Sequence, residues 1–506
     1  MKRLNELFKV ESDLKIESIH SDSRYVRKDS IFFCIEGLVT DGHKYVDDAI
    51  FQGAKCIVHS KPLRRYYQGI VYIQVPDVLD ELNRVADLFY DHPSYKMTGI
   101  GVTGTSGKTV VARVVARLLG CYLKMGYVGN NGIEYGATMM QMTGTTPDPI
   151  CLHRNFYNMV KENVKGFTLE VSSHGLAMKR VDSVNFSIVV FTNAYEEHMD
   201  FHGTVDNLMT SYVKLFRLLK EGGYAILNAD EVRFNHYLNT NYKDLSDHAK
   251  ILTYGIHHKA DIMAREIEYY IDHSAFNIYI KNHYYHVEVP IIAPFNISNT
   301  LAILTTLYAL EMTPDEIVNA IKYIQPVEGR MEVVPVKQPF HIIVDYCQHV
   351  HNFEEVFKFV HSVKGNGHLI AVFGAPGRKD IHKRSKIGAL ANKYCDYVIL
   401  TEQDERDDDI EGICSQIQEQ IVDPISVIIT NRRFAIQQAI DSACAGDVIL
   451  ILGKGHEQFM TSLVGNTPYP GDKFIAQEYA KKLYNEEQEE VSKLSPNCKQ
   501  KLEIRR

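Results

Sequence analysis

The sequence predicts an α/β fold of three domains. Short apolar runs bounded by turn formers or charges alternate with helical periodicity along most of the 506 residues, which is typical of sheets that are at least partly parallel. One series of runs ends near residue 96, a second surrounds a Gly-rich loop, and a third starts near residue 330. We therefore expect a small α/β domain at 1–96, a central P-loop mononucleotide-binding domain at 97–328, a C-terminal doubly wound, Rossmann-like domain at 329–486 and a polar tail at 487–506.

The predicted elements follow the chain in that order. In the first domain we expect strands at 30–37, 54–60 and 69–77 and a helix at 44–54. In the central domain we expect strands at 96–104, 166–173, 186–193 and 224–230, with helices at 108–120 and 296–310. In the third we expect strands at 340–346, 368–377, 394–402, 425–430 and 447–455, with helices at 352–363, 383–394 and 410–421.

Composition and charge argue against a nucleic-acid-binding, secreted or membrane-spanning protein. The formal net charge of −8, from 55 basic and 63 acidic residues, argues against a nucleic-acid partner, which would favour a basic stripe. The nine cysteines lack a C-x-x-C pair, which indicates reduced thiols. The N-terminus has no apolar signal-peptide core, and no run approaches the length of a membrane span. We expect a cytoplasmic monomer without a membrane span.

The stretch "GVTGTSGKT" at 101–109 predicts a phosphate-binding loop. Gly104 and Gly107 permit a tight turn whose backbone N–H groups point at phosphate oxygens, and Lys108 supplies a positive charge. Thr109 offers a hydroxyl to Mg²⁺ at the start of the helix. The standard spacing requires a glycine five residues before Gly107, where Val102 stands, so the loop is a variant. The alternative is a Gly-rich turn with an exposed lysine.

Glu170 and His198 are candidate metal ligands. Each follows an apolar strand, and ligands bind at the carboxyl ends of the strands in open α/β sheets. Taken alone, each residue is better explained as a polar loop residue. In a domain that already binds phosphate, the metal role is the better interpretation.

Several segments in order resemble the Mur ligase family, and within it the tripeptide synthetases. They are "GTSGKT", "LEVSSH", "FTNAYEEHMDFHGT", "FNISNTLAI", "EGRME", "VDYCQHVHN" and "LGKGHE", and the resemblance spans roughly residues 15–485. It implies a first domain that binds the uridine nucleotide of a UDP-sugar. It also implies a reaction in which ATP phosphorylates the carboxylate of UDP-MurNAc-L-Ala-D-Glu and an amino acid's amine attacks the acyl phosphate, giving an amide in peptidoglycan precursor synthesis.

The resemblance also implies a role for each matching residue. Lys108, Glu170 and His198 would be catalytic, and Thr109, Glu170 and His198 would bind Mg²⁺. ATP would contact Gly104, Thr105, Ser106, Gly107, Lys108, Thr109, Asn296, Arg330 and Asp345. The UDP-sugar peptide would contact Ser23, Thr145, Thr146, Ser172 and Arg180. The amino acid would contact Arg406, Gly455 and Glu457.

The main departure from the family is Tyr212. The family places a lysine ten residues after the His of "HGT", and its carbamate supplies oxygen to a second Mg²⁺. Here that position is Tyr212, and a phenol cannot form the carbamate; Lys214 should face another side of the helix. Gln348, the pair Val350 and His351, and the pair Ala293 and Pro294 also differ from the family. These changes raise the alternative of a specialised or impaired paralogue.

Residues 403–406 indicate which amino acid the ligase would add to its substrate. Diaminopimelate-adding members carry Asp-Asn-Pro-Arg where this chain has "QDER". Arg406 persists, and its guanidinium can clamp a distal carboxylate. Asp404 and Glu405 add negative charge that could neutralise Arg406 or favour a more cationic amine; a solvated acidic loop is the other explanation. We expect diaminopimelate or a related diamino acid.

The sequence therefore predicts an ATP- and Mg²⁺-dependent acid–amino-acid ligase. One alternative is a divergent ligase acting on another carboxylate in a secondary pathway. The other is a nucleotide-binding pseudoenzyme that holds its ligands without turnover.

Overall fold

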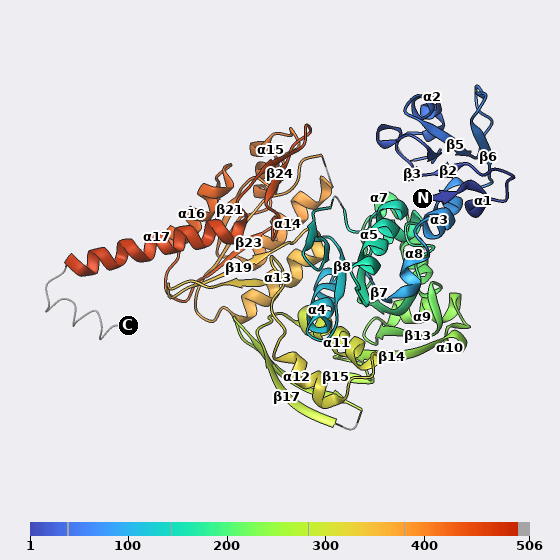
Figure 1. The fold of residues 1–506 in the computed structure, drawn as a ribbon. Coiled ribbons are helices and arrows are strands. Elements are labelled where there is room, and N and C mark those ends of the chain that lie inside the picture. Colours follow the sequence, from blue (N-terminus) through green and yellow to red (C-terminus); the bar gives the residue numbers. More distant parts are fainter. Residues whose placement is uncertain (38–39, 143, 282, 379, 494–506) are drawn as a thin grey trace. The chain divides into compact units, whose positions relative to one another are not determined.

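The computed structural model describes residues 1–37, 40–142, 144–281, 283–378 and 380–493 (Figure 1). The chain forms two compact units. The first comprises residues 1–263, 279–283 and 298–320, and the second comprises 264–278, 284–297 and the chain from 321 onward.

The first unit begins with a small parallel sheet of order β3-β4-β5-β6, drawn in blue in Figure 1. Buried side chains pack on both of its faces, for example Phe33 on one and Phe32 on the other. The elements of this region are β1 (Lys2–Arg3), α1 (Leu4–Leu7), β2 (Lys15–Ile16), β3 (Ser18–His20), η1 (Ser23–Tyr25), β4 (Ser30–Phe33), η2 (Gly42–Tyr45), α2 (Val46–Phe51), β5 (Ala54–His59), β6 (Val71–Gln74), α3 (Val78–Phe89) and η3 (Pro93–Lys96).

A larger sheet follows, of order β10-β9-β8-β11-β7-β12-β13-β14-β15-β16-β17. Its central strands β8, β11, β7, β12, β13 and β14 are parallel. The strands are β7 (Thr98–Thr103), β8 (Met125–Gly129), β9 (Gly132–Tyr135), β10 (Thr138–Met140), β11 (Gly166–Val171), β12 (Phe186–Phe191), β13 (Leu219–Asn228), β14 (Ala249–Gly255), β15 (Ile262–Tyr269), β16 (Ser274–Ile280) and β17 (His283–Val289). The helices are α4 (Lys108–Gly120), α5 (Pro149–Lys161), α6 (Ser173–Ala177), α7 (Met199–His202), α8 (Val205–Phe216), α9 (Val232–Asn241), α10 (Leu245–His248), α11 (Pro294–Ala309) and α12 (Pro314–Ile321).

The second unit contains a doubly wound sheet of order β18-β19-β23-β20-β21-β22, parallel except for β18. Two separate apolar cores line its faces, one under α13 to α15 and the other under α16 and α17. Its strands are β18 (Glu332–Val334), β19 (His341–Asp345), β20 (Leu369–Phe373), β21 (Tyr397–Leu400), β22 (Ile425–Ile428), β23 (Val448–Leu452), β24 (Phe459–Thr461) and β25 (Asn466–Pro468). Its helices are α13 (Val350–Val363), α14 (His382–Tyr394), α15 (Ile410–Gln418), α16 (Arg432–Ser442) and α17 (Asp472–Lys493).

Local signals place the helix starts. Asp148 caps α5 by accepting from the backbone N–H groups of Ile150 and Cys151, and Pro149 occupies the first turn, where no N–H partner is needed. Thr204 caps α8 in the same way, through Asn207 N. The predicted strands and helices are confirmed, with small shifts at their ends.

The start of the predicted C-terminal tail is helical in the structure. Helix α17 continues to Lys493, past the predicted boundary at residue 486, and the rest of the tail lies outside the described residues. In the part of the chain that the structure describes, no helix is long and apolar enough to cross a membrane.

Candidate functional site

The Gly-rich loop of residues 104–107 joins β7 to α4 in the first unit. Gly104 has φ +134°, and a Cβ there would lie 2.2 Å from Thr192 Oγ1. Gly107 has φ +86°, and its Cβ would lie 2.2 Å from Asn299 Oδ1. Both glycines are therefore required by backbone conformation and by close neighbours.

The segment that follows β12 holds this loop. Thr105 N donates to Asn193 O at 2.9 Å, and Ser106 N donates to Asn193 Oδ1 at 2.8 Å. Tyr195 N donates to Thr105 Oγ1 at 3.0 Å. These bonds fix the loop at the carboxyl ends of β7 and β12, which are neighbours in the sheet.

Lys108 folds back over the loop. Its Nζ donates to the carbonyl oxygens of Gly104 and Thr105, each at 2.7 Å. The ammonium group therefore lies within the loop that the sequence predicts to bind phosphate.

Glu170 lies at the end of β11, the other neighbour of β7, and is buried, with a relative exposure of 1%. Thr109 Oγ1 donates to Glu170 Oε2 at 2.8 Å. The Tyr127 hydroxyl and Asn130 N, the latter at 3.1 Å, donate to Oε1. Burial raises the pKa of Tyr127, and the charge of Glu170 raises it further, so the phenol stays protonated as a donor. A buried carboxylate with three donors is well oriented.

A second polar group surrounds Ser172. Thr146 Oγ1 lies 3.2 Å from Ser172 Oγ and accepts from Ser172 N at 3.0 Å. Arg180 Nη1 donates to Thr146 O at 2.7 Å. Thr145 is half-buried beside Thr146, while Ser23 is buried at the start of η1 in the small parallel sheet. The structure thus joins Thr146, Ser172 and Arg180 in one network.

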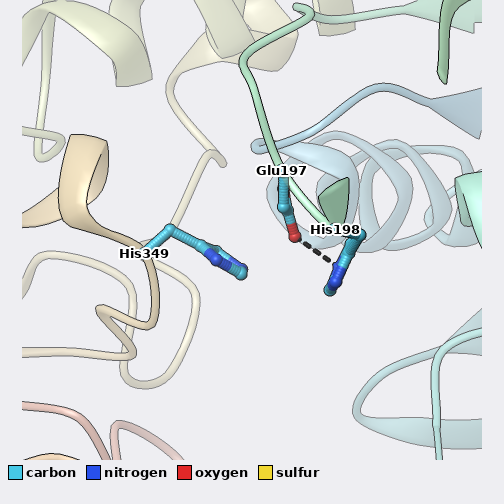
Figure 2. A group of neighbouring side chains, drawn as sticks. All are labelled: Glu197, His198 and His349. Atoms are coloured by element: carbon cyan, nitrogen blue, oxygen red, sulfur yellow. Dashed lines mark ion pairs between the residues drawn. The ribbon is translucent and has the colours of Figure 1, made fainter. Parts of the chain in front are cut away.

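His198 belongs to a different set of contacts from Glu170. Its backbone is left-handed, with φ +55°, and it precedes α7. His198 Nε2 lies 2.7 Å from Glu197 Oε1, the pair joined by the dashed line in Figure 2. Its ring lies 4.5 Å from that of His174, and burial, helped by the charges of His198 and His202, lowers the pKa of His174 to about 4.

Tyr212 points inward from α8 and has a relative exposure of 2%. Its hydroxyl lies 3.1 Å from Thr105 Oγ1, and its ring packs against Phe191 and Phe234. Burial raises the pKa of Tyr212, so it remains a neutral phenol. Lys214 lies two residues further along the chain. Burial raises the pKa of Asp182, and the positive charge of Lys214 partly opposes that rise.

In the second unit, Arg330 and Asp345 lie together. Arg330 Cζ sits 4.6 Å from the centre of the Tyr346 ring. Asp345 Oδ2 accepts from Met331 N at 2.8 Å. Burial raises the pKa of Asp345 to about 6, although the Arg330 charge opposes the shift. Close backbone packing also explains Gly455, whose Cβ would lie 2.6 Å from Tyr346 Cβ.

Asn296, in the same unit, is buried and donates from Nδ2 to Ile292 O at 3.0 Å. Ala293 precedes it with φ +83°, a left-handed conformation that favours glycine. The resemblance implies a glycine before "FN", and the backbone at Ala293 has the conformation that suits one.

Asp404 does not neutralise Arg406. Asp404 Oδ1 accepts from Lys454 Nζ at 2.8 Å, and Lys454 also pairs with Glu457 Oε2 at 2.5 Å. Arg406 Nη1 contacts Gly377 O at 3.4 Å, and Arg406 forms no ion pair with any residue in the described ranges. The sequence raises neutralisation of Arg406 by Asp404 and Glu405 as a possibility, and within the described residues Arg406 forms an ion pair with neither.

Three family models match consecutive parts of the chain. They are the Mur ligase family catalytic domain at residues 15–90, the Mur ligase middle domain at 102–307 and the Mur ligase glutamate ligase domain at 329–455. The chain is 33% identical over 479 residues to the UDP-N-acetylmuramoyl-L-alanyl-D-glutamate–2,6-diaminopimelate ligase of Clostridioides difficile (strain 630), covering 94% of this chain and 97% of that protein. The chain belongs to the Mur ligase family.

Other members of the family add a different amino acid. The UDP-N-acetylmuramoyl-L-alanyl-D-glutamate–L-lysine ligase of Staphylococcus haemolyticus (strain JCSC1435) is 32% identical to this Mur ligase, over 88% of this chain and 90% of that protein. Sequence similarity of this level is therefore shared with both diaminopimelate and lysine ligases.

Solved structures agree on the fold. A 2,6-diaminopimelate ligase structure matches with a TM-score of 0.69 at 24% identity, over 96% of this chain and 99% of that chain. The MurF ligase of Thermotoga maritima, in complex with ADP, matches with a TM-score of 0.63 at 18% identity, over 94% and 100%. The predicted three-domain α/β fold of this Mur ligase is confirmed, while the exact domain limits remain a prediction.

Several residues of this Mur ligase contact the candidate site without having been predicted. Asn299 packs against Gly107, Asn193 holds the loop, Tyr127 orients Glu170, and Lys454 pairs with Glu457. Three had a signal in the sequence, since Asn193 lies within the motif "FTNAYEEHMDFHGT". Asn299 lies one helical turn after Asn296 in "FNISN", and Lys454 lies within "LGKGHE".

Proposed function

We propose that this Mur ligase uses ATP and Mg²⁺ to join a diamino acid to UDP-N-acetylmuramoyl-L-alanyl-D-glutamate in peptidoglycan precursor synthesis. The names of its relatives support this substrate, and diaminopimelate and lysine are the amino acids that they name. The substrate carboxylate would be activated by phosphoryl transfer and then attacked by the amine, giving an amide, ADP and phosphate.

All eight cysteines in the described residues are free, which supports a cytoplasmic setting. We also propose that the enzyme acts as a monomer.

The observation that carries the proposal is the geometry of the Gly-rich loop. Gly104 to Gly107 lie between a buried strand and the N-terminus of α4, where backbone N–H groups and the helix dipole favour phosphate. Lys108 would give its ammonium group to the phosphates in exchange for the carbonyls of Gly104 and Thr105. In the second unit, Asn296, Arg330 and Asp345 would contact the rest of the nucleotide.

The residues near the loop fit Mg²⁺. Thr109 and Glu170 present a hydroxyl and a carboxylate 2.8 Å apart, and oxygen donors are the ligands that Mg²⁺ prefers. His198 would be a further ligand, with Glu197 orienting its ring. When bound, Mg²⁺ would neutralise charge on the phosphates. Tyr127 and Asn130 would hold Glu170 in place before the ion arrives.

The network around Ser172 supports binding of the UDP-sugar peptide. Arg180 is partly buried and lacks a carboxylate partner among the residues that the structure describes, so its guanidinium suits the substrate's carboxylate or pyrophosphate. Thr145, Thr146 and Ser172 would add hydroxyl donors. Ser23 would contact the uridine end from the first domain.

Arg406 supports diaminopimelate as the amino acid. Its charge is not neutralised by Asp404, because Lys454 takes that carboxylate. A guanidinium without an acidic partner can bind the distal carboxylate of diaminopimelate, which lysine lacks. Gly455 and Glu457 would lie at the amino acid's far end.

The test is phosphate release from ATP in the presence of UDP-MurNAc-L-Ala-D-Glu, compared across diaminopimelate, lysine and ornithine. We expect release that depends on the amino acid and is greatest with diaminopimelate. ATP binding without release for any amine would contradict ligase activity. Arg406→Ala should raise KM for diaminopimelate selectively, and an equal loss for every amine would contradict its role.

Tyr212 favours a second candidate, a nucleotide-binding pseudoenzyme. Its phenol is neutral and hydrogen-bonded to Thr105, so it cannot supply the anionic oxygen of the lysine carbamate. Tyr212→Lys separates the candidates. If the native protein is inactive and this variant turns over with bicarbonate, the pseudoenzyme proposal is supported; rapid turnover by the native protein contradicts it.

A further inference from the structure

Lys454 is a fully buried cation between two carboxylates of the second unit. The exposed fraction of its side chain is 0%, and those of Asp404 and Glu457 are 11% and 14%. Lys454 Nζ lies 2.8 Å from Asp404 Oδ1 and 2.5 Å from Glu457 Oε2. A lysine so buried needs paired charge, and here it has two partners.

The carboxylate of Glu457 is held from both sides. Lys454 takes Oε2, and the Tyr346 hydroxyl donates to Oε1 at 2.9 Å. Burial raises the pKa of Tyr346, and the charge of Glu457 raises it further, so the phenol remains a donor at neutral pH. Two donors from different segments fix both oxygens and therefore the direction of the side chain.

Asp404 fixes the loop that carries Arg406. Asp404 Oδ1 accepts from Thr461 N at 2.8 Å as well as from Lys454, and Arg406 N donates to Thr461 O at 3.4 Å. Asp404 has φ +66°, which Asp and Asn tolerate better than most residues. One carboxylate thus ties the loop both to β24 and to the segment with Lys454.

We propose that Lys454 and Asp404 are positioning residues for amino-acid selection. Lys454 aims Glu457, and Asp404 both anchors the Arg406 loop and shares the charge of Lys454. This inference rests on the proposed function, because it assumes that Arg406 and Glu457 meet the far end of the incoming amino acid.

The charge count explains why a carboxylate at position 404 matters. Asp404 and Glu457 carry two negative charges against the one positive charge of Lys454, so the group keeps a net negative charge near Glu457. Arg406 is the positive counterpart on the adjoining loop. An amino acid whose far end carries both an ammonium and a carboxylate group matches this pair of charges. With an asparagine at 404, Lys454 would neutralise Glu457 and weaken attraction for the ammonium group.

Asp404→Asn in the full-length protein tests the proposal. The amide can still accept from Thr461 N, but its ion pair with Lys454 is lost. We expect KM for both diaminopimelate and lysine to rise about tenfold, since a charge-assisted hydrogen bond contributes at this level, while kcat and KM for ATP stay within about twofold. Asp407→Asn is the matched control, because Asp407 is exposed on the same loop and also has a left-handed backbone.

Tyr346→Phe is the second variant, and it removes the other donor to Glu457. It should raise KM for both amino acids without changing KM for ATP, unlike Arg406→Ala, which should affect diaminopimelate alone. Amino-acid KM values unchanged in both Asp404→Asn and Tyr346→Phe would overturn the proposal. If Asp404→Asn does not fold, Tyr346→Phe decides by itself. A native protein that ligates no amino acid contradicts the proposed function instead, so the two failures are distinct.

Discussion

Tyr212 and Asp404 both depart from the pattern of the Mur ligase family, and they change charge in opposite directions. Tyr212 puts a neutral phenol where the resemblance implies a carbamylated lysine, and Asp404 puts a carboxylate where the resemblance implies the asparagine of diaminopimelate-adding members. Around Tyr212 the partners are a hydroxyl and aromatic rings, whereas around Asp404 the partner is a buried ammonium group. Each substitution is matched by its immediate surroundings, so neither can be interpreted from its residue type alone.

The two regions also differ in whether a buried carboxylate has a cationic partner. Glu231 lies near Tyr212, accepts from Ala194 N at 3.3 Å and has no cationic partner among the residues the structure describes. Burial raises its pKa to about 7. Asp404 and Glu457, in contrast, share Lys454. Substitutions at these positions should therefore have effects of different size and different pH dependence.

The largest effect is expected at the buried ammonium group. Lys454→Met should lower the free energy of unfolding by about 3–5 kcal/mol, because it leaves two buried carboxylates without a cation. Urea denaturation at pH 7 measures the change. The control is Lys482→Met, which removes an exposed ion pair with Glu486 and should cost less than about 1 kcal/mol. A similar small loss for Lys454→Met would show that the buried pair contributes little to stability.

Glu231→Gln should have an intermediate effect of the opposite sign. The raised pKa means that the folded protein holds the Glu231 proton more tightly than the unfolded chain does. That contribution to stability is complete below the ordinary pKa of 4.5 and is lost as pH rises through about 7. The variant should therefore be more stable than the native protein above pH 7, by about 1–3 kcal/mol, with the difference vanishing below pH 4.5.

Thermal or urea unfolding across pH 4 to 8 (roughly the range of the shift) measures this difference. Glu221→Gln, at an exposed site, is the control and should show a flat difference. If Glu231→Gln destabilises the protein equally at every pH, the carboxylate acts through its hydrogen bond and not through its charge.

The smallest effect is expected at Tyr212. Tyr212→Phe keeps the aromatic packing and removes one neutral hydrogen bond to Thr105, so the free energy of unfolding should fall by about 1 kcal/mol. Because Thr105 belongs to the Gly-rich loop, KM for ATP should rise slightly while kcat is retained. A fall in kcat of more than about a hundredfold would instead place the hydroxyl in the reaction itself.

The elements that the sequence predicts are confirmed because their local signals agree with one another. Helix α4 runs from Lys108 to Gly120, as expected from an apolar-periodic run that follows a glycine turn. Thr109 and Glu170, two of the three predicted Mg²⁺ ligands, lie together because β7 and β11 are parallel neighbours. The third, His198, contacts Glu197 and His174.

The supporting contacts could not be predicted in the same way. Tyr127 and Glu170 are 43 residues apart, and Tyr212 and Thr105 are 107 apart. Such pairs depend on strand order and on which side chains the core directs toward the sheet's end, and a single sequence carries no local sign of either. Lys454 lies within the motif "LGKGHE", but its pairing with Asp404 depends on the fold of a loop that begins 50 residues earlier.

The folded-back position of Lys108 has a consequence for how phosphate enters. Lys108 Nζ already donates to the carbonyl oxygens of Gly104 and Thr105, so under the proposed function an arriving phosphate would exchange hydrogen bonds and not simply add them. The two displaced carbonyl oxygens must then accept hydrogen bonds from water or from another N–H or O–H group. The heat of binding should be small for that reason, and the affinity should come from charge and released water. Under the proposed function, phosphate binding would therefore require Lys108 Nζ to leave the carbonyl oxygens of Gly104 and Thr105.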